Sequence, residues 1–123
     1  MDAVRILLVD DQPAYLRAMI SVVQETPNFV VVGEASSGEE SLVVVAGVVP
    51  DLVLMDVNLP GMDGVQATRL LRAGESPPVV VLLSTYDDDA GERFVAESGA
   101  AAYVTQSAFG PDRLLDIWRA VVR

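Results

Sequence analysis

The sequence VRILLVDDQP, residues 4–13, joins a mostly apolar run to two aspartates and a proline. Val, Ile and Leu without regular polar alternation are typical of a strand that is covered on both faces of a parallel sheet. Asp11-Gln12-Pro13 predicts a helix start, because proline fits the first turn of a helix and a capping residue stands beside it. The stretch therefore predicts a buried strand that leads directly into a helix.

The same strand-then-helix unit recurs along the chain. Apolar runs alternate with segments of helical length, and the five predicted strands are residues 4–9, 29–35, 51–55, 79–83 and 101–105. Strict alternation of this kind predicts an α/β sandwich around a central parallel sheet. Because crossovers between parallel strands are right-handed, a chain of 123 residues has few topologies open to it. We expect a flavodoxin-like (βα)5 doubly wound fold with the strand order 2-1-3-4-5.

Local start signals mark the predicted helices. Ser37-Gly38-Glu39-Glu40 and Asp63-Gly64-Val65-Gln66 each fit a capping box. The acidic run 87–89 places negative charge at the start of a helix over about 88–98, where the helix dipole favours it. A last helix over about 111–122 follows Gly110-Pro111-Asp112. This helix is expected to bury one stripe of side chains: Leu114, Ile117, Trp118 and Val121.

The helix predicted over about 39–48 is rich in valine, which makes it the most ambiguous element. Valine loses side-chain freedom in a helix and has modest helix propensity, so a strand is the alternative. A strand there would need a pairing partner, whereas two parallel strands need a crossover between them. The capping box that begins at Ser37 also favours a helix. We therefore expect a helix.

The composition excludes several classes of site. The chain has 18 acidic and 8 basic residues, a formal net charge of −10, and no lysine, histidine or cysteine. Disulfides, Cys/His zinc sites and Ser–His nucleophile pairs are therefore excluded. Hydrophobic residues make up 51% of the 123 residues, enough for one domain with a buried core.

The same numbers bear on partners and location. An acidic surface repels the phosphate backbone, so we expect no direct nucleic-acid binding by this domain. The longest valine-rich stretch ends at Pro50-Asp51, short of the length that spans a bilayer, so we expect no membrane contact. The N-terminus lacks the basic segment and cleavage site of a secretory signal, which predicts a cytoplasmic protein.

Three aspartates stand at the ends of two strands that are neighbours in the expected sheet. Asp10 and Asp11 follow the strand 4–9, and Asp56 follows the strand 51–55. Carboxyl ends of parallel strands meet at one edge, so the three carboxylates should converge where the strand order reverses. Like charges this close require protonation or a cation, and oxygen ligands suit Mg²⁺. The alternative is that Asp10 and Asp11 only cap a helix while Asp56 starts a turn.

Four stretches carry a resemblance to a known family: VDDQP (9–13), LMDVNLPGMDG (54–64), LLST (82–85) and GAAAYV (99–104). Over about residues 4–122 the chain resembles the receiver domain of bacterial two-component response regulators. LLSTYDDD followed by SGAAAYV is most similar to receivers that precede DNA-binding helix-turn-helix domains, which implies transcription regulation. The resemblance implies one receiver domain over residues 1–123, with no output domain present.

The resemblance also assigns a phosphoryl-transfer site. It implies that Asp56 is the phosphoacceptor, which takes a phosphoryl group from a sensor histidine kinase or a small phosphodonor. Asp10, Asp11 and Asp56, together with the backbone carbonyl of Asn58, would hold Mg²⁺. Such a domain catalyses only its own phosphorylation and dephosphorylation, so we do not expect a metabolic enzyme.

Four further roles follow from the resemblance. The Ser84 hydroxyl would donate to the phosphoryl oxygens, and Tyr103 would turn inward as Ser84 moves toward the phosphate. Asn58 and Tyr86 occupy positions that modulate loss of the phosphoryl group in such domains. Without the resemblance, Ser84 would be interpreted as a turn residue and Tyr103 as a core residue.

Phosphorylation is expected to shift a two-state equilibrium of one face of the domain. This face consists of the predicted helix 88–98, the strand 101–105 and the helix 111–122. It would bind a downstream effector or a second copy of the chain.

One position departs from the family pattern. Gln106 stands three residues after Tyr103, where the family has a lysine. Glutamine donates hydrogen bonds but carries no charge, so three carboxylates with one Mg²⁺ keep an uncompensated negative charge. In one interpretation Asp56 is still phosphorylated, more slowly or with weaker coupling. In the other, the domain is a pseudo-receiver that acts as a phosphorylation-independent protein-interaction module.

A weaker similarity points to a different class of protein. Asp56-Val57-Asn58 is loosely similar to the Asp-x-Asp nucleophile loop of haloacid-dehalogenase-type phosphatases. Those enzymes have a larger fold with a cap and need a second acid at the position of Asn58, which argues against this class.

Overall fold

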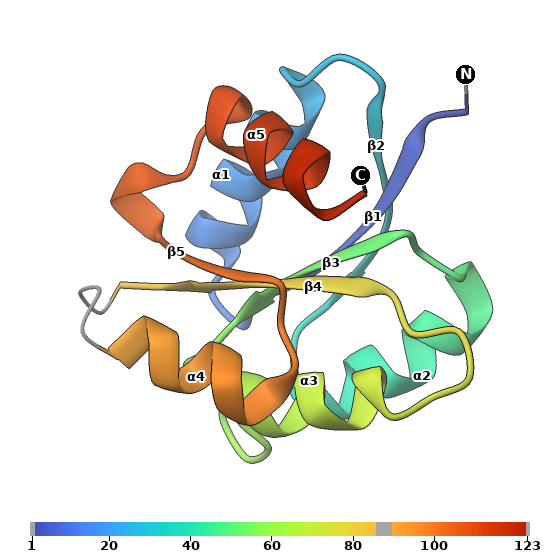
Figure 1. Ribbon diagram of the computed structural model, residues 1–123, viewed down its shortest axis with the longest axis vertical. Coiled ribbons are helices and arrows are strands. Elements are labelled where there is room, and N and C mark those ends of the chain that lie inside the picture. The colour runs from blue at the N-terminus through green and yellow to red at the C-terminus, as the bar shows by residue number, and fades with distance from the viewer. Residues whose placement is uncertain (1, 86–89, 123) are drawn as a thin grey trace.

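A computed structural model describes residues 2–85 and 90–122 (Figure 1). The described strands are β1 (Val4–Val9), β2 (Phe29–Ala35), β3 (Leu52–Asp56), β4 (Val79–Ser84) and β5 (Ala102–Thr105). The described helices are α1 (Pro13–Gln24), α2 (Gly38–Val48), α3 (Gly64–Arg72), α4 (Gly91–Ser98), α5 (Pro111–Val121) and the short 3-10 helix η2 (Gln106–Ala108). The predicted strands are confirmed, with one-residue shifts at ends of β3, β4 and β5. Among the described helices, none has the length and apolarity needed to cross a membrane.

The five strands form one parallel sheet in the order β2-β1-β3-β4-β5, which confirms the flavodoxin-like topology. Helices α1 and α5 cover one face of the sheet, and α2, α3 and α4 cover the other (Figure 1). Because all strands run in one direction, their carboxyl ends share one edge. β1 and β3 are neighbours at the point where the strand order reverses, so the chain segments that follow them meet at that edge.

Each face of the sheet has its own hydrophobic core. Ile6 and Leu54 are fully buried on the side of α1 and α5, together with Leu114 of α5. Leu7 and Met55 are fully buried on the side of α2, α3 and α4. Successive residues of β1 and β3 thus supply opposite cores, which is why their apolar runs show no alternation.

Local capping explains where α3 and α2 begin. The Asp63 carboxylate accepts from the Gln66 backbone N–H (2.8 Å), and the Gln66 side chain accepts from the Asp63 N–H (3.3 Å), so this capping box is confirmed. At α2 the Ser37 hydroxyl accepts from the Glu40 backbone N–H (3.0 Å). The Glu40 carboxylate accepts from the N–H of Ser36 (2.7 Å) instead of Ser37, so only the first half of that box forms as predicted. The valine-rich helix itself is confirmed.

Helix α1 begins at Pro13 as predicted, but the expected side-chain cap is absent. Its N-cap residue is Gln12, whose side chain makes no capping hydrogen bond. Asp11 lies one residue too early to cap the helix, because the capping residue immediately precedes the first helical one.

Helix α5 buries part of the stripe of side chains predicted for it. Leu114 and Ile117 are buried in α5, and the partly buried Trp118 packs edge-on against Phe29 at 6.4 Å between ring centroids. Val121 is 36% exposed, so its predicted burial is wrong; it is the last residue of α5, where the helix extends past the core. The acidic run 87–89 and the predicted helix start at 88 lie outside the described residues.

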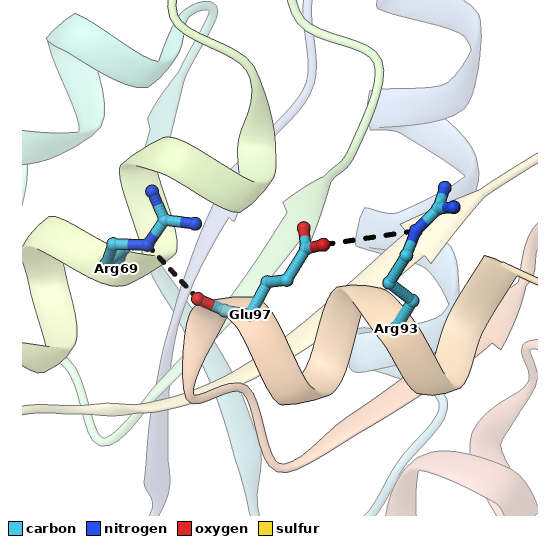
Figure 2. A network of polar contacts seen from close by, with 3 residues as sticks. All are labelled: Arg69, Arg93 and Glu97. Carbon is cyan, nitrogen blue, oxygen red and sulfur yellow. Dashed lines mark hydrogen bonds and ion pairs between the residues drawn. The ribbon is translucent and has the colours of Figure 1, made fainter.

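Polar contacts join α3 to the C-terminal end of α4 (Figure 2). The Arg69 Nε donates to the backbone carbonyl of Glu97 (3.1 Å), and the Glu97 carboxylate lies 4.0 Å from the Arg93 Nε one turn earlier. The pair between Arg93 and Glu97 is exposed and long, so it adds little stability. The bond from Arg69 to the backbone of Glu97 links the two helices directly.

The residue after α2 has an unusual backbone conformation that allows a stability test. Val49 caps α2 with φ 47° and ψ 66°, in the left-handed region, and its side chain is 69% exposed. A β-branched residue is strained there, and glycine is the usual C-terminal cap. We expect Val49→Gly to raise the free energy of unfolding by about 1 kcal/mol in urea denaturation.

The matched control is Val43→Gly, which changes another exposed valine within the same helix. Because its backbone is helical, this substitution should lower the free energy of unfolding by about 0.5 kcal/mol. The same sign for both variants would contradict the strain at Val49.

Candidate functional site

The three predicted acidic residues converge at the carboxyl edge of the sheet. Asp10 and Asp11 follow β1, and Asp56 is the last residue of β3. The pairing of Val9 with Met55 places Asp10 beside Asp56 on the neighbouring strand. One carboxylate oxygen from each aspartate lies within 4.8 Å of the others. The three carboxylates therefore lie close together, as the sequence predicts.

The three carboxylates differ in how deeply they are buried. Asp10 and Asp56 are 1% and 7% exposed, whereas Asp11 is exposed to solvent. The Oδ1 of Asp10 accepts from the backbone N–H of Gln12 (2.9 Å), and the Oδ1 of Asp56 accepts from the backbone N–H of Asn58 (3.1 Å). Within the described part of the chain, the Oδ2 of Asp10 is buried and has no hydrogen-bond partner. A buried carboxylate oxygen without a donor is costly and calls for a further partner.

This environment disfavours the ionised form of both buried acids. The pKa of Asp10 is raised to about 6, mainly by burial; the charges of Asp56 and Asp11 contribute to the increase, and the N–H of Gln12 partly offsets it. Burial also raises the pKa of Asp56, partly offset by the N–H of Asn58, and the charge of Asp11 adds to the increase. The cluster is thus stabilised by protons or by a cation.

The donor set fits a hard divalent cation. Three carboxylates within reach of one point, one with an unpartnered oxygen, are the oxygen ligands that Mg²⁺ prefers. Two of the three are buried, so a cation there would be only partly exposed to water. The backbone carbonyl of Asn58 stays a predicted ligand.

A cavity of about 210 Å³ opens beside Asp56. The described residues that line it are Gln12, Tyr15, Asp56, Asn58, Thr85 and Gln106. Asn58 and Gln106 were predicted site residues, and the structure brings both to Asp56. Gln12, Tyr15 and Thr85 were missed. Their positions in the sequence could have identified them, because Gln12 and Tyr15 follow the aspartate pair into α1 and Thr85 directly follows Ser84.

The two predicted switch residues that the structure describes, Ser84 and Tyr103, are not among the described residues that line this cavity. Ser84 ends β4, is fully buried and pairs with Thr105 of β5. Tyr103 is partly buried on β5, with its ring 6.0 Å from that of Phe94 between centroids. Tyr86 lies outside the described residues.

Tyr103 belongs to a second cavity, of about 480 Å³, between α4, β5 and α5. Its other lining residues are Gly91, Glu92, Val95, Ala96 and Arg113. The structure thus places Tyr103 on the face of α4, β5 and α5.

Two glycines permit close backbone approaches at these sites. A Cβ on Gly64 would overlap the backbone carbonyl oxygen of Asp56, so α3 can begin directly behind Asp56 only without a side chain there. A Cβ on Gly91 would overlap the ring of Tyr103, so the ring lies against the bare backbone at the start of α4.

Comparisons with known proteins agree with this geometry. A family model described as the response regulator receiver domain matches residues 6–119. The signal receiver domain of NarL from Mycobacterium tuberculosis is similar in structure, with a TM-score of 0.84 and 29% identity over 100% of both chains. The transcriptional regulatory protein LiaR of Bacillus subtilis is 32% identical over 105 residues, 85% of this chain and 50% of LiaR. A protein-glutamate methylesterase/protein-glutamine glutaminase of Myxococcus xanthus is 35% identical over 111 residues, 90% of this chain and 31% of that protein. The chain spans half or less of these two curated relatives.

The acidic cluster predicts a pH dependence of stability. Since the pKa of Asp10 rises from 3.8 to about 6, the native state keeps a proton that the unfolded chain releases between these values. In EDTA, the free energy of unfolding should therefore fall as the pH rises from about 4 to about 6. We expect Asp10→Asn to reduce this fall and to be about 3 kcal/mol more stable than the wild type at pH 7.

Urea denaturation at a series of pH values measures both effects. Asp116→Asn, an exposed acid on α5, is the matched control and should leave the pH profile unchanged. Equal slopes for the wild type and Asp10→Asn would contradict the assignment.

Proposed function

Because the chain belongs to the response regulator receiver domain family, we propose that it is a signalling switch whose phosphoacceptor is Asp56. In the proposed reaction, a carboxylate oxygen of Asp56 attacks the phosphorus of a phosphohistidine on a sensor kinase. A P–O bond forms, the P–N bond breaks, and its electron pair stays on the imidazole nitrogen. One observation carries this proposal: Asp56 belongs both to the acidic cluster and to the wall of an open cavity.

The acidic cluster would bind the metal ion, and the cavity would hold the phosphoryl group. Asp10, Asp11 and Asp56 would hold a divalent cation, which we propose is Mg²⁺ with the carbonyl of Asn58 as a further ligand. Bound there, the cation would neutralise the carboxylates and the charge of the incoming phosphoryl group. The backbone N–H of Asn58 holds the Asp56 carboxylate in place, while the cavity leaves room for the phosphoryl group.

We propose that phosphorylation changes the conformation of the domain through β4 and β5. Ser84 would move toward the phosphoryl group, and the pairing of Ser84 with Thr105 links that movement to β5. Tyr103 lies two residues before Thr105 and would turn inward from its position against Gly91. Asn58 beside Asp56 and Tyr86 after Thr85 would modulate loss of the phosphoryl group.

The proposed partners are a sensor histidine kinase at the phosphorylation site and an effector or second copy at the face of α4, β5 and α5. The relatives join similar domains to different outputs, since one is named a transcriptional regulator and another a methylesterase. We propose that residues 1–123 form one receiver domain that acts in the cytoplasm and, by its similarity to LiaR and NarL, controls transcription.

A second candidate function is that of a pseudo-receiver. In the part of the chain that the structure describes, no basic residue lines the cavity beside Asp56, and Gln106 stands where the family has a lysine. In that case protein contacts, without phosphorylation, would regulate the domain. The acidic cluster favours the first candidate, because without a cation it would only destabilise the fold.

Phosphoryl gain can be measured directly by intact mass. With Mg²⁺ and acetyl phosphate or phosphoramidate, the wild type should gain one phosphoryl group when the reaction is quenched quickly. Asp56→Asn should gain none, because an amide is not nucleophilic enough, and EDTA should abolish labelling of the wild type. The control Asp116→Asn should label like the wild type. No gain by the wild type with several donors and a cognate kinase would overturn the first candidate and favour the pseudo-receiver.

Gln106→Lys tests whether the absence of a lysine at this position slows phosphorylation. A lysine there would neutralise charge on the phosphoryl group, so we expect the initial rate of phosphoryl gain to rise on the order of tenfold. Gln24→Lys, at the far end of α1, changes the net charge equally and should leave the rate unchanged. Equal rates for Gln106→Lys and the wild type would contradict this account of the departure.

A further inference from the structure

Among the described residues that line the cavity beside Asp56, several are hydrogen-bond donors and none is basic. Within residues 2–85 and 90–122, Asp56 is the one charged residue of the lining, and the others are Gln12, Tyr15, Asn58, Thr85 and Gln106. A phosphoryl group on Asp56 would bring at least one further negative charge into this cavity. Neutral donors must then stabilise the oxygens that face away from the metal side.

Tyr15 and Gln106 have donors available for this purpose. Within residues 2–85 and 90–122, neither side chain makes a hydrogen bond or an ion pair. Tyr15 lines the cavity and its side chain is 38% exposed, so it is not part of the hydrophobic core. A buried tyrosine normally uses its hydroxyl inside the protein, whereas this one faces space that a ligand can occupy.

The topology brings the two side chains to the cavity from opposite sides of Asp56. Tyr15 lies in the first turn of α1, which follows β1, and Gln106 begins η2, which follows β5. β3, which carries Asp56, lies between β1 and β5 in the sheet. The two side chains can therefore flank a group attached to Asp56.

We propose that Tyr15 and Gln106 clamp the phosphoryl group on Asp56, and that the Tyr15 hydroxyl compensates in part for the missing lysine. This inference rests on the proposed phosphoacceptor function. When acetyl phosphate is the donor, an Asp56 oxygen forms the new P–O bond while the bond from phosphorus to acetate breaks and acetate leaves with the electron pair. Tyr15 and Gln106 donate hydrogen bonds to non-bridging oxygens throughout and transfer no proton. Their contribution grows as charge shifts onto these oxygens, which lowers the barrier.

The test removes only the hydroxyl. Tyr15→Phe keeps the aromatic ring, and we expect its initial rate of phosphoryl gain from acetyl phosphate and Mg²⁺ to fall on the order of tenfold. Ser21→Ala, which removes another exposed hydroxyl from α1, is the matched control and should label at the wild-type rate. Intact mass at short times measures all the rates.

A double-mutant cycle separates direct contact from a structural effect. In the Gln106→Lys background the lysine supplies the missing charge, so Tyr15→Phe should slow labelling by less than about threefold. An equal loss in both backgrounds would overturn the clamp, because it would indicate a general change in the site. Wild-type labelling with no effect of Tyr15→Phe would overturn the clamp alone. Absence of labelling in the wild type would instead overturn the proposed function and the clamp with it.

Discussion

Repulsion among three carboxylates at one edge of the sheet is the constraint around which this structure is organised. Asp10 and Asp56 end neighbouring parallel strands, so the pairing of β1 with β3 forces them together, and Asp11 adds a third charge. Burial raises the pKa of both buried acids. A fold that holds such a cluster without a proton or a cation loses stability, and binding a cation there restores it.

The rest of the scaffold supplies the stability that the cluster removes. Two hydrophobic cores, one on each face of the sheet, bury the apolar runs of β1, β3 and β4 almost completely. Gly64 lets α3 begin directly behind Asp56, and the capping box at Asp63 holds that start in place. The acidic edge is thus carried on rigid elements, which suits a site that must hold charges at fixed separations.

The site is asymmetric in charge, and this asymmetry links its chemistry to its signalling. Asp10 and Asp11 lie beside Asp56, whereas the other described residues that line the adjoining cavity are neutral, Gln106 among them. The second cavity, with Tyr103 against Gly91, lies on the face of α4, β5 and α5. Pairing between β4 and β5 connects the two regions, so a weaker hold on the phosphoryl group would also weaken its effect on the distant face.

Most of the fold followed from the sequence alone, because strand burial, strand order and the capping box at Asp63 depend on local pattern and a few topological rules. The same rules placed Asp10, Asp11 and Asp56 at one edge. Tertiary structure alone decided which side chains share a cavity, since Tyr15, Thr85 and Gln106 come from three separate segments whose meeting no local pattern records. It also decided that Val121 is exposed and that Val49 is left-handed, because a helix's last turn depends on what packs against it.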